Sequence, residues 1–235
     1  MTESKPLCVI AGAGPGNGQA LCDKFQREGY RVVLLARDLS RLQAMAGDDP
    51  EVVAMACDMA DPSSIESALG DILRAQGAPA VFIHNAGSGL FGAPMQASLD
   101  DFESAWRINA LGLLRASQLL APAMVENGGG SILVTGATAS LRGGANFAAF
   151  ASAKAAQRNL AQSLARSLGP QGVHVALFII DGVIDIPRAR ELFGEKPDDF
   201  YMQAADIADT FYHVAQQAPS AWTFEVDLRR AAESW

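Results

Sequence analysis

The alternation of short apolar runs with longer helical patterns is the feature that most restricts how this chain can fold. The runs that read as strands are Leu7–Ala11, Arg31–Ala36, Val52–Ala56, Ala80–His84, Ser131–Thr135, His174–Ile179 and Thr223–Val226. The patterns that read as helices are Gly18–Glu28, Leu39–Ala46, Pro62–Gln76, Leu99–Glu126, Phe147–Leu168 and Ala204–Gln217. This alternation is typical of repeated βαβ units, so we expect an α/β fold with a parallel sheet of seven strands.

The domain organisation follows from the length of the chain. A chain of 235 residues that is 49% hydrophobic can bury one full core, so we expect a single domain over residues 1–235. One connection, Asp181 to Met202, is long and rich in Pro, Asp and Arg. Long connections inside a compact domain are commonly functional loops, so we expect residues 181–202 to be a mobile loop over a substrate site.

The charge of the chain limits its partners and its compartment. A formal net charge of −8 argues against nucleic acid or an anionic membrane as the main partner, because both repel an anion. Cys8, Cys22 and Cys57 lack disulfide or metal-ligand spacing, so we expect core thiols in a reducing compartment and no metal site. The N-terminal apolar run is too short for a signal peptide, and no uncharged stretch is long enough to span a bilayer. We therefore expect a cytoplasmic protein.

A glycine-rich turn directly follows the first expected strand. In "AGAGPGNGQALC", Gly12, Gly16 and Gly18 form a GxxxGxG pattern around Asn17. Without side chains the backbone can turn tightly and approach a pyrophosphate at the N-terminus of the following helix. A glycine pattern alone is a weak signal, but this position after the first strand favours nucleotide binding over a purely structural turn.

The end of the second strand indicates which nucleotide is preferred. Where an acidic residue would bind the adenosine ribose, the sequence reads "LLARDLSRL". Ala36 cannot form that bond, whereas Arg37 can pair with a 2′-phosphate, so NADP(H) is favoured over NAD(H). Asp38 leaves an alternative open, because it can neutralise Arg37. Arg41 either assists at the phosphate or is a solvated surface residue.

The ends of the next two strands add further candidates for the nucleotide site. In "CDM", the Asp58 carboxylate is placed to accept a hydrogen bond from the adenine amino group, and Met59 follows it as a further candidate. In "HNAG", the small residues Asn85, Ala86 and Gly87 allow the backbone to come close to a cofactor.

In combination these motifs resemble the short-chain dehydrogenase/reductase family. The sequence carries GxxxGxG, NAG, an NxxG at Asn109 and Gly112, and Lys154 at the end of a YxxxK-like segment, in the order found in the family. The resemblance runs from about Leu7 to Asp227. It implies a single-domain Rossmann fold with a doubly wound sheet, a nicotinamide cofactor, hydride transfer to or from a small-molecule substrate, and a homodimer or homotetramer.

The catalytic pattern of that family is incomplete in this chain. In the family a Tyr transfers a proton, a Lys four residues later binds the nicotinamide ribose, a Ser polarises the substrate oxygen and an Asn anchors a water relay. By resemblance Lys154 and Asn109 keep their places, but Phe150 stands at the Tyr position and Ala137 at the Ser position. A phenyl ring has no exchangeable proton, so acid or base catalysis at position 150 is absent.

Nearby hydroxyl groups are weak replacements. Ser152 lies about 200° around the helix from Phe150 and faces away from it. Thr138 and Ser140 flank the Ala137 position, where they either orient a substrate oxygen or cap the backbone. Tyr201 ends the expected mobile loop and is a further, unsupported candidate.

A third departure lies in "IIDGVIDIP", which resembles the family's PGxxxTP. Asp181 replaces the Pro and Ile186 replaces the Thr, while Gly182 and Ile184 fall where the family's backbone contacts the cofactor. A carboxyl group sheltered by apolar neighbours can stay protonated and serve as the missing acid, which is one hypothesis for Asp181. The alternative is an aspartate that forms a turn or anchors the loop.

Two functions remain open from the sequence. The first is an NADP(H)-dependent oxidoreductase acting on a carbonyl, iminium or activated alkene, in which either a water ordered by Asn109 and Lys154 or the Asp181 carboxyl delivers the proton. The second is a catalytically silent NADP(H)-binding sensor or assembly subunit on the same scaffold. Phe147, Phe150 and Lys154 share one helix face, which is either simple packing or an apolar substrate wall beside a cation.

Overall fold

The structure is a computed structural model that describes residues 5–232. Its main sheet has seven strands in the order β3-β2-β1-β4-β5-β6-β9, and every pairing between them is parallel. The strands are β1 Leu7–Ala11, β2 Arg31–Ala36, β3 Val52–Ala56, β4 Val81–His84, β5 Gly130–Ala137, β6 Val173–Asp181 and β9 Glu225–Arg229. The predicted seven-stranded parallel α/β fold is confirmed, and the strand order reverses between β1 and β4, where open α/β sheets bind their ligands.

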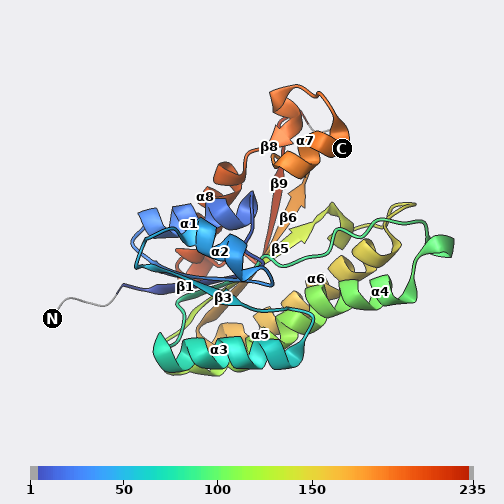
Figure 1. Ribbon diagram of the computed structural model, residues 1–235. Coiled ribbons are helices and arrows are strands. Elements are labelled where there is room, and N and C mark those ends of the chain that lie inside the picture. Colours follow the sequence, from blue (N-terminus) through green and yellow to red (C-terminus); the bar gives the residue numbers. More distant parts are fainter. Residues whose placement is uncertain (1–4, 233–235) are drawn as a thin grey trace.

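Helices cover both faces of this sheet (Figure 1). They are α1 Asn17–Arg27, α2 Leu39–Ala46, α3 Pro62–Ala75, α4 Leu99–Trp106, α5 Gly112–Glu126, α6 Ala148–Leu168, α7 Pro187–Phe193 and α8 Ala204–Ala215. Short 3₁₀ turns occupy Pro94–Gln96, Thr138–Ser140, Gly169–Gln171, Asp198–Phe200 and Pro219–Ala221.

Each face of the sheet has its own apolar core. One core joins the sheet to α3 and α5 through residues such as Leu69 and Leu120. The other joins it to α1 and α8 through residues such as Phe25 and Phe211. In Figure 1, α3, α5 and α6 accordingly lie on one side of the sheet and α1, α2 and α8 on the other. The doubly wound arrangement brings all the loops at the carboxyl ends of the strands to one edge.

The helix expected over Leu99–Glu126 is interrupted. Arg107–Leu111 form a π-helical turn between α4 and α5. The Asn109 side chain donates from Nδ2 to the carbonyl oxygen of Ala105 at 2.9 Å, a local bond that competes with regular helix geometry. The extra residue in the turn sets the direction in which Asn109 points. By length and composition alone the whole run could cross a membrane, but 50% of its apolar window is buried inside the protein, as in a core helix.

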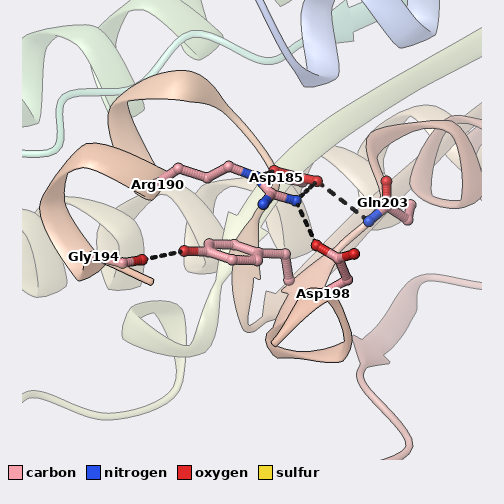
Figure 2. A network of polar contacts seen from close by, with 6 residues as sticks. Asp185, Arg190, Gly194, Asp198 and Gln203 are labelled. Atoms are coloured by element: carbon pink, nitrogen blue, oxygen red, sulfur yellow. Dashed lines mark hydrogen bonds and ion pairs between the residues drawn. The ribbon is translucent and has the colours of Figure 1, made fainter. Parts of the chain in front are cut away.

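The segment expected as a loop, residues 181–202, is more ordered than the sequence predicts; we call it the lid. It contains β7 Val183–Ile184, α7, the 3₁₀ turn Asp198–Phe200 and β8 Tyr201–Met202, and β7 pairs with β8. Arg190 binds both Asp185 and Asp198 inside it (Figure 2). Pro187 opens α7 at a position where a missing N–H is tolerated. The mobility of the lid stays a prediction.

The three cysteines occupy the core as expected. Cys8, Cys22 and Cys57 are buried free thiols. Burial raises the pKa of the Cys57 thiol to about 11 and that of Cys22 to about 12. These thiols are therefore poor nucleophiles near neutral pH.

Candidate active site

A cavity of about 650 Å³ lies at the edge of the sheet where the strand order reverses. It brings together seven of the residues predicted to bind a cofactor: Gly12, Arg37, Asp58, Met59, Asn85, Ala86 and Gly87. It is also lined by Ala13, Ala36, Asp38, Arg41, Cys57 and Ile108. Residues from the ends of four strands thus meet in one cleft, as parallel strand order requires.

The glycine turn fits the cleft because side chains would not. A Cβ at Gly12, where φ is +83°, would lie 2.3 Å from the backbone nitrogen of Ala86. A Cβ at Gly18 would lie 2.8 Å from Ala13 Cα. Helix α1 begins after Gly16 without a side-chain cap and without an acidic residue in its first turn. Its first N–H groups and its dipole therefore favour an anionic group at this end of the cleft.

Asn17 and Ile186 border the same turn. Asn17 is buried, and its Oδ1 has no hydrogen-bond partner within residues 5–232. The Cγ2 methyl of Ile186 lies 2.3 Å from the position of a Cβ at Gly16. The residue that replaces the family's threonine therefore lies directly over the glycine turn and offers it only an apolar contact.

The arginine at the end of β2 keeps its charge available. Asp38 is the N-cap of α2 and accepts from the backbone nitrogen of Arg41 at 3.0 Å. Its other carboxylate oxygen lies 3.4 Å from the Arg41 guanidinium. Among the residues that the structure describes, no ion pair involves Arg37. Asp38 is thus paired with Arg41, which leaves the Arg37 guanidinium exposed to the cleft.

Asp58 and Asn85 are both fixed by local bonds. The Asp58 carboxylate accepts from the backbone nitrogen of Ala60 at 2.9 Å, which sets its direction at the cleft wall. Asn85 donates to the Gly12 carbonyl at 2.9 Å and accepts from the Thr135 hydroxyl at 2.9 Å. Asn85 therefore ties the ends of β1, β4 and β5 together, and its side chain positions the cleft rather than facing a ligand.

Gly87 lies between the two family residues that this chain retains. A Cβ at Gly87 would lie 3.5 Å from both Asn109 Oδ1 and Lys154 Nζ. Asn109 is fully buried, and its Oδ1 has no partner among the described residues. The small turn after β4 thus brings both side chains beside Gly87, which lines the cavity, whereas Asn109 and Lys154 are not among its lining residues.

Lys154 is a buried ammonium group with neutral partners. Its Nζ donates to the Thr135 carbonyl at 2.7 Å and to Gln157 Oε1 at 3.0 Å. Only 4% of the residue is exposed, and this burial lowers the pKa of Lys154 to about 7. Lys154 therefore changes its charge near neutral pH, which an exposed lysine does not do.

His84 is a fully buried histidine at the end of β4 that supports the helix carrying Asn109. Its Nε2 donates to the Asn109 carbonyl at 3.3 Å and so supports the π-helical turn. Burial, and secondarily the charge of Lys154, lower the pKa of His84 to about 3, so the ring is neutral at physiological pH.

The side chains around the two positions that lack a catalytic group have structural roles. The Phe150 ring packs edge-on against Phe91 at 5.7 Å between centroids, and Phe91 packs against Phe147 at 5.1 Å. Ser140 Oγ accepts from the backbone nitrogen of Ala137 at 3.2 Å, which is the capping role. Thr138 donates its hydroxyl to Asp181. Both hydroxyl groups that flank position 137 therefore have structural partners.

The tyrosines lie in other regions. Tyr201 is buried in the lid, where its hydroxyl donates to the Gly194 carbonyl at 3.4 Å and Arg190 lies over its ring at 4.7 Å. Tyr30 accepts from Gln216 Nε2, and Tyr212 packs against Phe25. The Ser152 hydroxyl bonds back to the Ala148 carbonyl on its own helix. None of these hydroxyl groups takes the place of a phenol at position 150.

Asp181 is held at the end of β6 by two partners. It accepts from Thr138 and lies 3.5 Å from the Arg229 guanidinium. These contacts match the loop-anchoring alternative for this residue. Gly182 and Ile184 lie beside Met202 in the lid and are not among the residues that line the large cavity.

Comparisons with known proteins agree with this arrangement. Residues 7–196 match the model of the short chain dehydrogenase family. An uncharacterized short-chain type dehydrogenase/reductase of Sinorhizobium fredii is 35% identical over 176 residues, which cover 71% of this chain and 70% of the relative.

Solved structures give the same result. A short-chain dehydrogenase from Rhodopseudomonas palustris has a TM-score of 0.81 and 31% identity, covering 95% of this chain and 98% of the other. A metagenomic short-chain oxidoreductase in complex with NADP has a TM-score of 0.82 and 27% identity, covering 97% of this chain and 98% of the other.

Proposed function

The chain belongs to the short-chain dehydrogenase/reductase family, and on that premise we propose that it is an NADP(H)-dependent oxidoreductase with non-standard proton delivery. The observation that carries the coenzyme preference is the pairing of Asp38 with Arg41, which leaves Arg37 available to a 2′-phosphate. The related metagenomic oxidoreductase was solved with NADP, which supports the same choice. When bound, the nicotinamide coenzyme supplies or accepts a hydride.

The cleft has the features that a dinucleotide requires. Gly12 and Gly18 leave room for close approach of the coenzyme to the backbone, and the uncapped N-terminus of α1 faces the expected pyrophosphate. Asp58 holds its carboxylate at the wall for the adenine amino group. Lys154 and Asn109 lie beside Gly87 of the cavity wall, where the ribose of the nicotinamide belongs by resemblance to the family.

Proton delivery at this site depends on Lys154 and Asn109. Phe150 has no proton to give, and the loss of a general acid lowers a rate by about 10² to 10⁴ without preventing hydride transfer. The Lys154 ammonium can release a proton, and Asn109 Oδ1 has no partner within the described residues and can hold a water. Asp181, the other acid considered, is engaged by Thr138 and Arg229 and serves better as an anchor.

This chemistry favours substrates that need little help from an acid. An iminium ion already carries the positive charge, and hydride addition to its carbon gives a neutral amine with no proton required. An activated alkene delocalises the negative charge that a hydride brings, so protonation can follow later. A simple ketone lacks both advantages and is the poorest substrate that we propose for this site.

Three phenylalanines support an apolar substrate. Phe91 and Phe147 are 59% and 39% exposed, and with Phe150 they form a continuous aromatic wall. A backbone bridge joins Gly92 to Phe147, and the Phe147 ring packs against Gly144, where a Cβ would lie 2.8 Å from it. Exposed rings grouped in this way gain free energy by burying an apolar or aromatic group.

Coenzyme titration tests the proposal. We expect NADPH to bind more tightly than NADH by about tenfold or more, since a charge-assisted contact of about 1.4 kcal/mol or more is involved. Arg37→Ala should remove most of this preference while leaving NADH affinity unchanged, and Arg74→Ala on the outer side of α3 is the matched control. Equal affinity for both coenzymes in the wild type would refute the NADP(H) preference.

A catalytically silent NADP(H)-binding sensor or assembly subunit would show the same titration result. The two proposals separate in single-turnover experiments with carbonyl, iminium and activated-alkene compounds. Oxidation of bound NADPH by any of these compounds supports the enzyme, whereas its complete absence supports the sensor.

We also propose a homodimer or homotetramer. Helix α4 exposes Leu99, Phe102 and Trp106, which a monomer would leave in contact with water. Light scattering after gel filtration measures the assembly directly. A monomer at micromolar concentration would contradict this part of the proposal.

A further inference from the structure

Gln157 is a fully buried polar side chain to which the proposed reaction assigns no role. It follows Lys154 by one turn on α6, and its Oε1 accepts from Lys154 Nζ at 3.0 Å. Its Nε2 is also buried and has no partner within residues 5–232. A buried amide with an unused donor is unfavourable compared with an apolar side chain of similar size. Packing alone therefore does not explain a glutamine at this position.

Within residues 5–232, Lys154 has no counter-ion that would fix its charge. Helix α6 packs against α4, α5, β5, β6, the π-helical turn and the 3₁₀ turns at Thr138–Ser140 and Gly169–Gln171. The titratable residues on these elements and on α6 itself, with His84 of β4, are Asp100, Asp101, Glu103, Arg107, Arg115, Glu126, Arg158, Arg166, His174 and Asp181. No ion pair joins any of them to Lys154 in the described part of the chain, and His84 is neutral. Both acceptors of the ammonium, Thr135 O and Gln157 Oε1, are neutral.

A primary amide can pair with either form of a lysine. An ammonium group only donates, so it requires the Oε1 side of Gln157, as the structure shows. A neutral amine has a lone pair and can accept from Nε2 after the amide turns over, which would satisfy the donor that now has no partner. A carboxylate would stabilise only the charged form, and an apolar side chain would pair with neither.

We propose that Gln157 is a positioning residue that holds Lys154 Nζ beside Gly87 in both protonation states, so that the lysine can release and regain a proton without moving. The ammonium gives its proton to the atom that becomes basic after hydride transfer, and the resulting amine takes one back from water. The use of this proton in catalysis rests on the proposed function. The pairing of Gln157 with both forms of Lys154 does not.

The unfolding of the protein without coenzyme tests the pairing. The variants are Gln157→Glu, Gln157→Met and the control Gln162→Glu, which adds the same charge on α6 away from Lys154. The measurement is the denaturant midpoint across about pH 6 to pH 10. Because burial depresses the pKa of Lys154, we expect the wild-type midpoint to rise with pH from about 7.

The variants should separate clearly. In Gln157→Glu the rise should begin about two pH units later or more, because a carboxylate keeps the ammonium charged. In Gln157→Met it should begin about half a pH unit or more earlier, because the charged form loses a charge-assisted hydrogen bond and the neutral form only a weaker one. Gln162→Glu should follow the wild type. A Gln157→Glu curve that coincides with that of Gln162→Glu would overturn the proposal, and if Gln157→Glu does not fold, an unshifted Gln157→Met curve would do so.

Coenzyme affinity supplies a second measurement. An ammonium beside an anionic dinucleotide strengthens binding, so the wild-type Kd for NADPH should rise about threefold or more between about pH 6.5 and pH 8.5. In Gln157→Glu this pH dependence should disappear, and in Gln162→Glu it should remain. If no form of the protein binds NADPH, the proposed function fails, while the unfolding series still decides the role of Gln157.

Discussion

Replacing Lys154 with methionine should stabilise the protein without coenzyme. The pKa of this lysine falls from its ordinary value of 10.5 to about 7 because the ammonium is buried, and no carboxylate compensates for the lost hydration among the described residues. At about 1.36 kcal/mol per pKa unit, burial of the ammonium lowers the free energy of unfolding by about 5 kcal/mol below pH 7. Methionine has a similar length and no charge, so the substitution removes this destabilisation.

The net gain is smaller because two acceptors lose their donor. The Thr135 carbonyl and Gln157 Oε1 would each be left without a partner, at about 1 kcal/mol or more each. We therefore expect Lys154→Met to raise the free energy of unfolding by about 2 to 3 kcal/mol at neutral pH and below.

The pH dependence identifies the cause. Between about pH 7 and pH 10.5 the unfolded wild type binds one proton more than the folded form, so wild-type stability rises with pH in that window. The advantage of Lys154→Met should therefore shrink by about 3 kcal/mol between pH 6.5 and pH 9. Urea unfolding of both proteins at the two pH values measures this difference. If the difference in unfolding free energy between the two proteins is the same at pH 6.5 and at pH 9, the reasoning is refuted.

Three further predictions concern the rest of the site. Phe150→Tyr combined with Ala137→Ser should raise the rate of ketone reduction by about 10² or more, because the double variant restores a proton donor. Steady-state kinetics measure this rate, and no gain would mean that the rest of the site is not arranged for catalysis. Asp181→Asn should lower the free energy of unfolding by about 1 to 2 kcal/mol, because it weakens the contacts with Thr138 and Arg229, and should change turnover by less than about twofold. A folded variant that has lost its turnover would show instead that Asp181 is the proton donor. Gly12→Ala should abolish NADPH binding and destabilise the fold by about 2 kcal/mol or more, since its Cβ would lie 2.3 Å from Ala86 N at a φ of +83°; calorimetry with and without NADPH checks both effects.

The regular part of the fold could be predicted because it depends on local patterns. β1, β2, β3 and α2 begin and end at the expected residues, since each apolar run is bounded by turn residues. The last strand was less well predicted, with Thr223–Val226 expected and Glu225–Arg229 observed. Its bounds depend on register with β6, where Leu177 pairs with Glu225, and the sequence near Thr223 does not contain that information.

The parts of the site that were missed depend on contacts between distant segments. Phe91 joins Phe147 and Phe150 only because the chain after β4 packs against the start of α6. Similarly, Ile186 reaches Gly16 across the fold. Both contacts require knowledge of the tertiary structure.

Other misses had a local signal that was too weak to use. The presence of Asn109 alone does not predict the π-helical turn, although the hydrogen bond from its side-chain amide to the Ala105 carbonyl stabilises that turn. The lid was expected to be irregular, but Arg190 with Asp185 and Asp198 organises it around α7. Gln157 follows Lys154 by three residues, a spacing that places both on one helix face, but the spacing does not show that the glutamine is buried.

Single-turnover reduction of a matched pair of compounds tests the central claim most directly. With saturating NADPH, an aromatic iminium ion and the ketone of the same shape are each mixed with the wild-type protein, and oxidation of NADPH is followed by absorbance. A site without the phenol at position 150 should reduce the iminium ion faster than the ketone by about 10² or more. A ketone reduced as fast as the iminium ion would contradict the account, because an efficient proton donor would then be present.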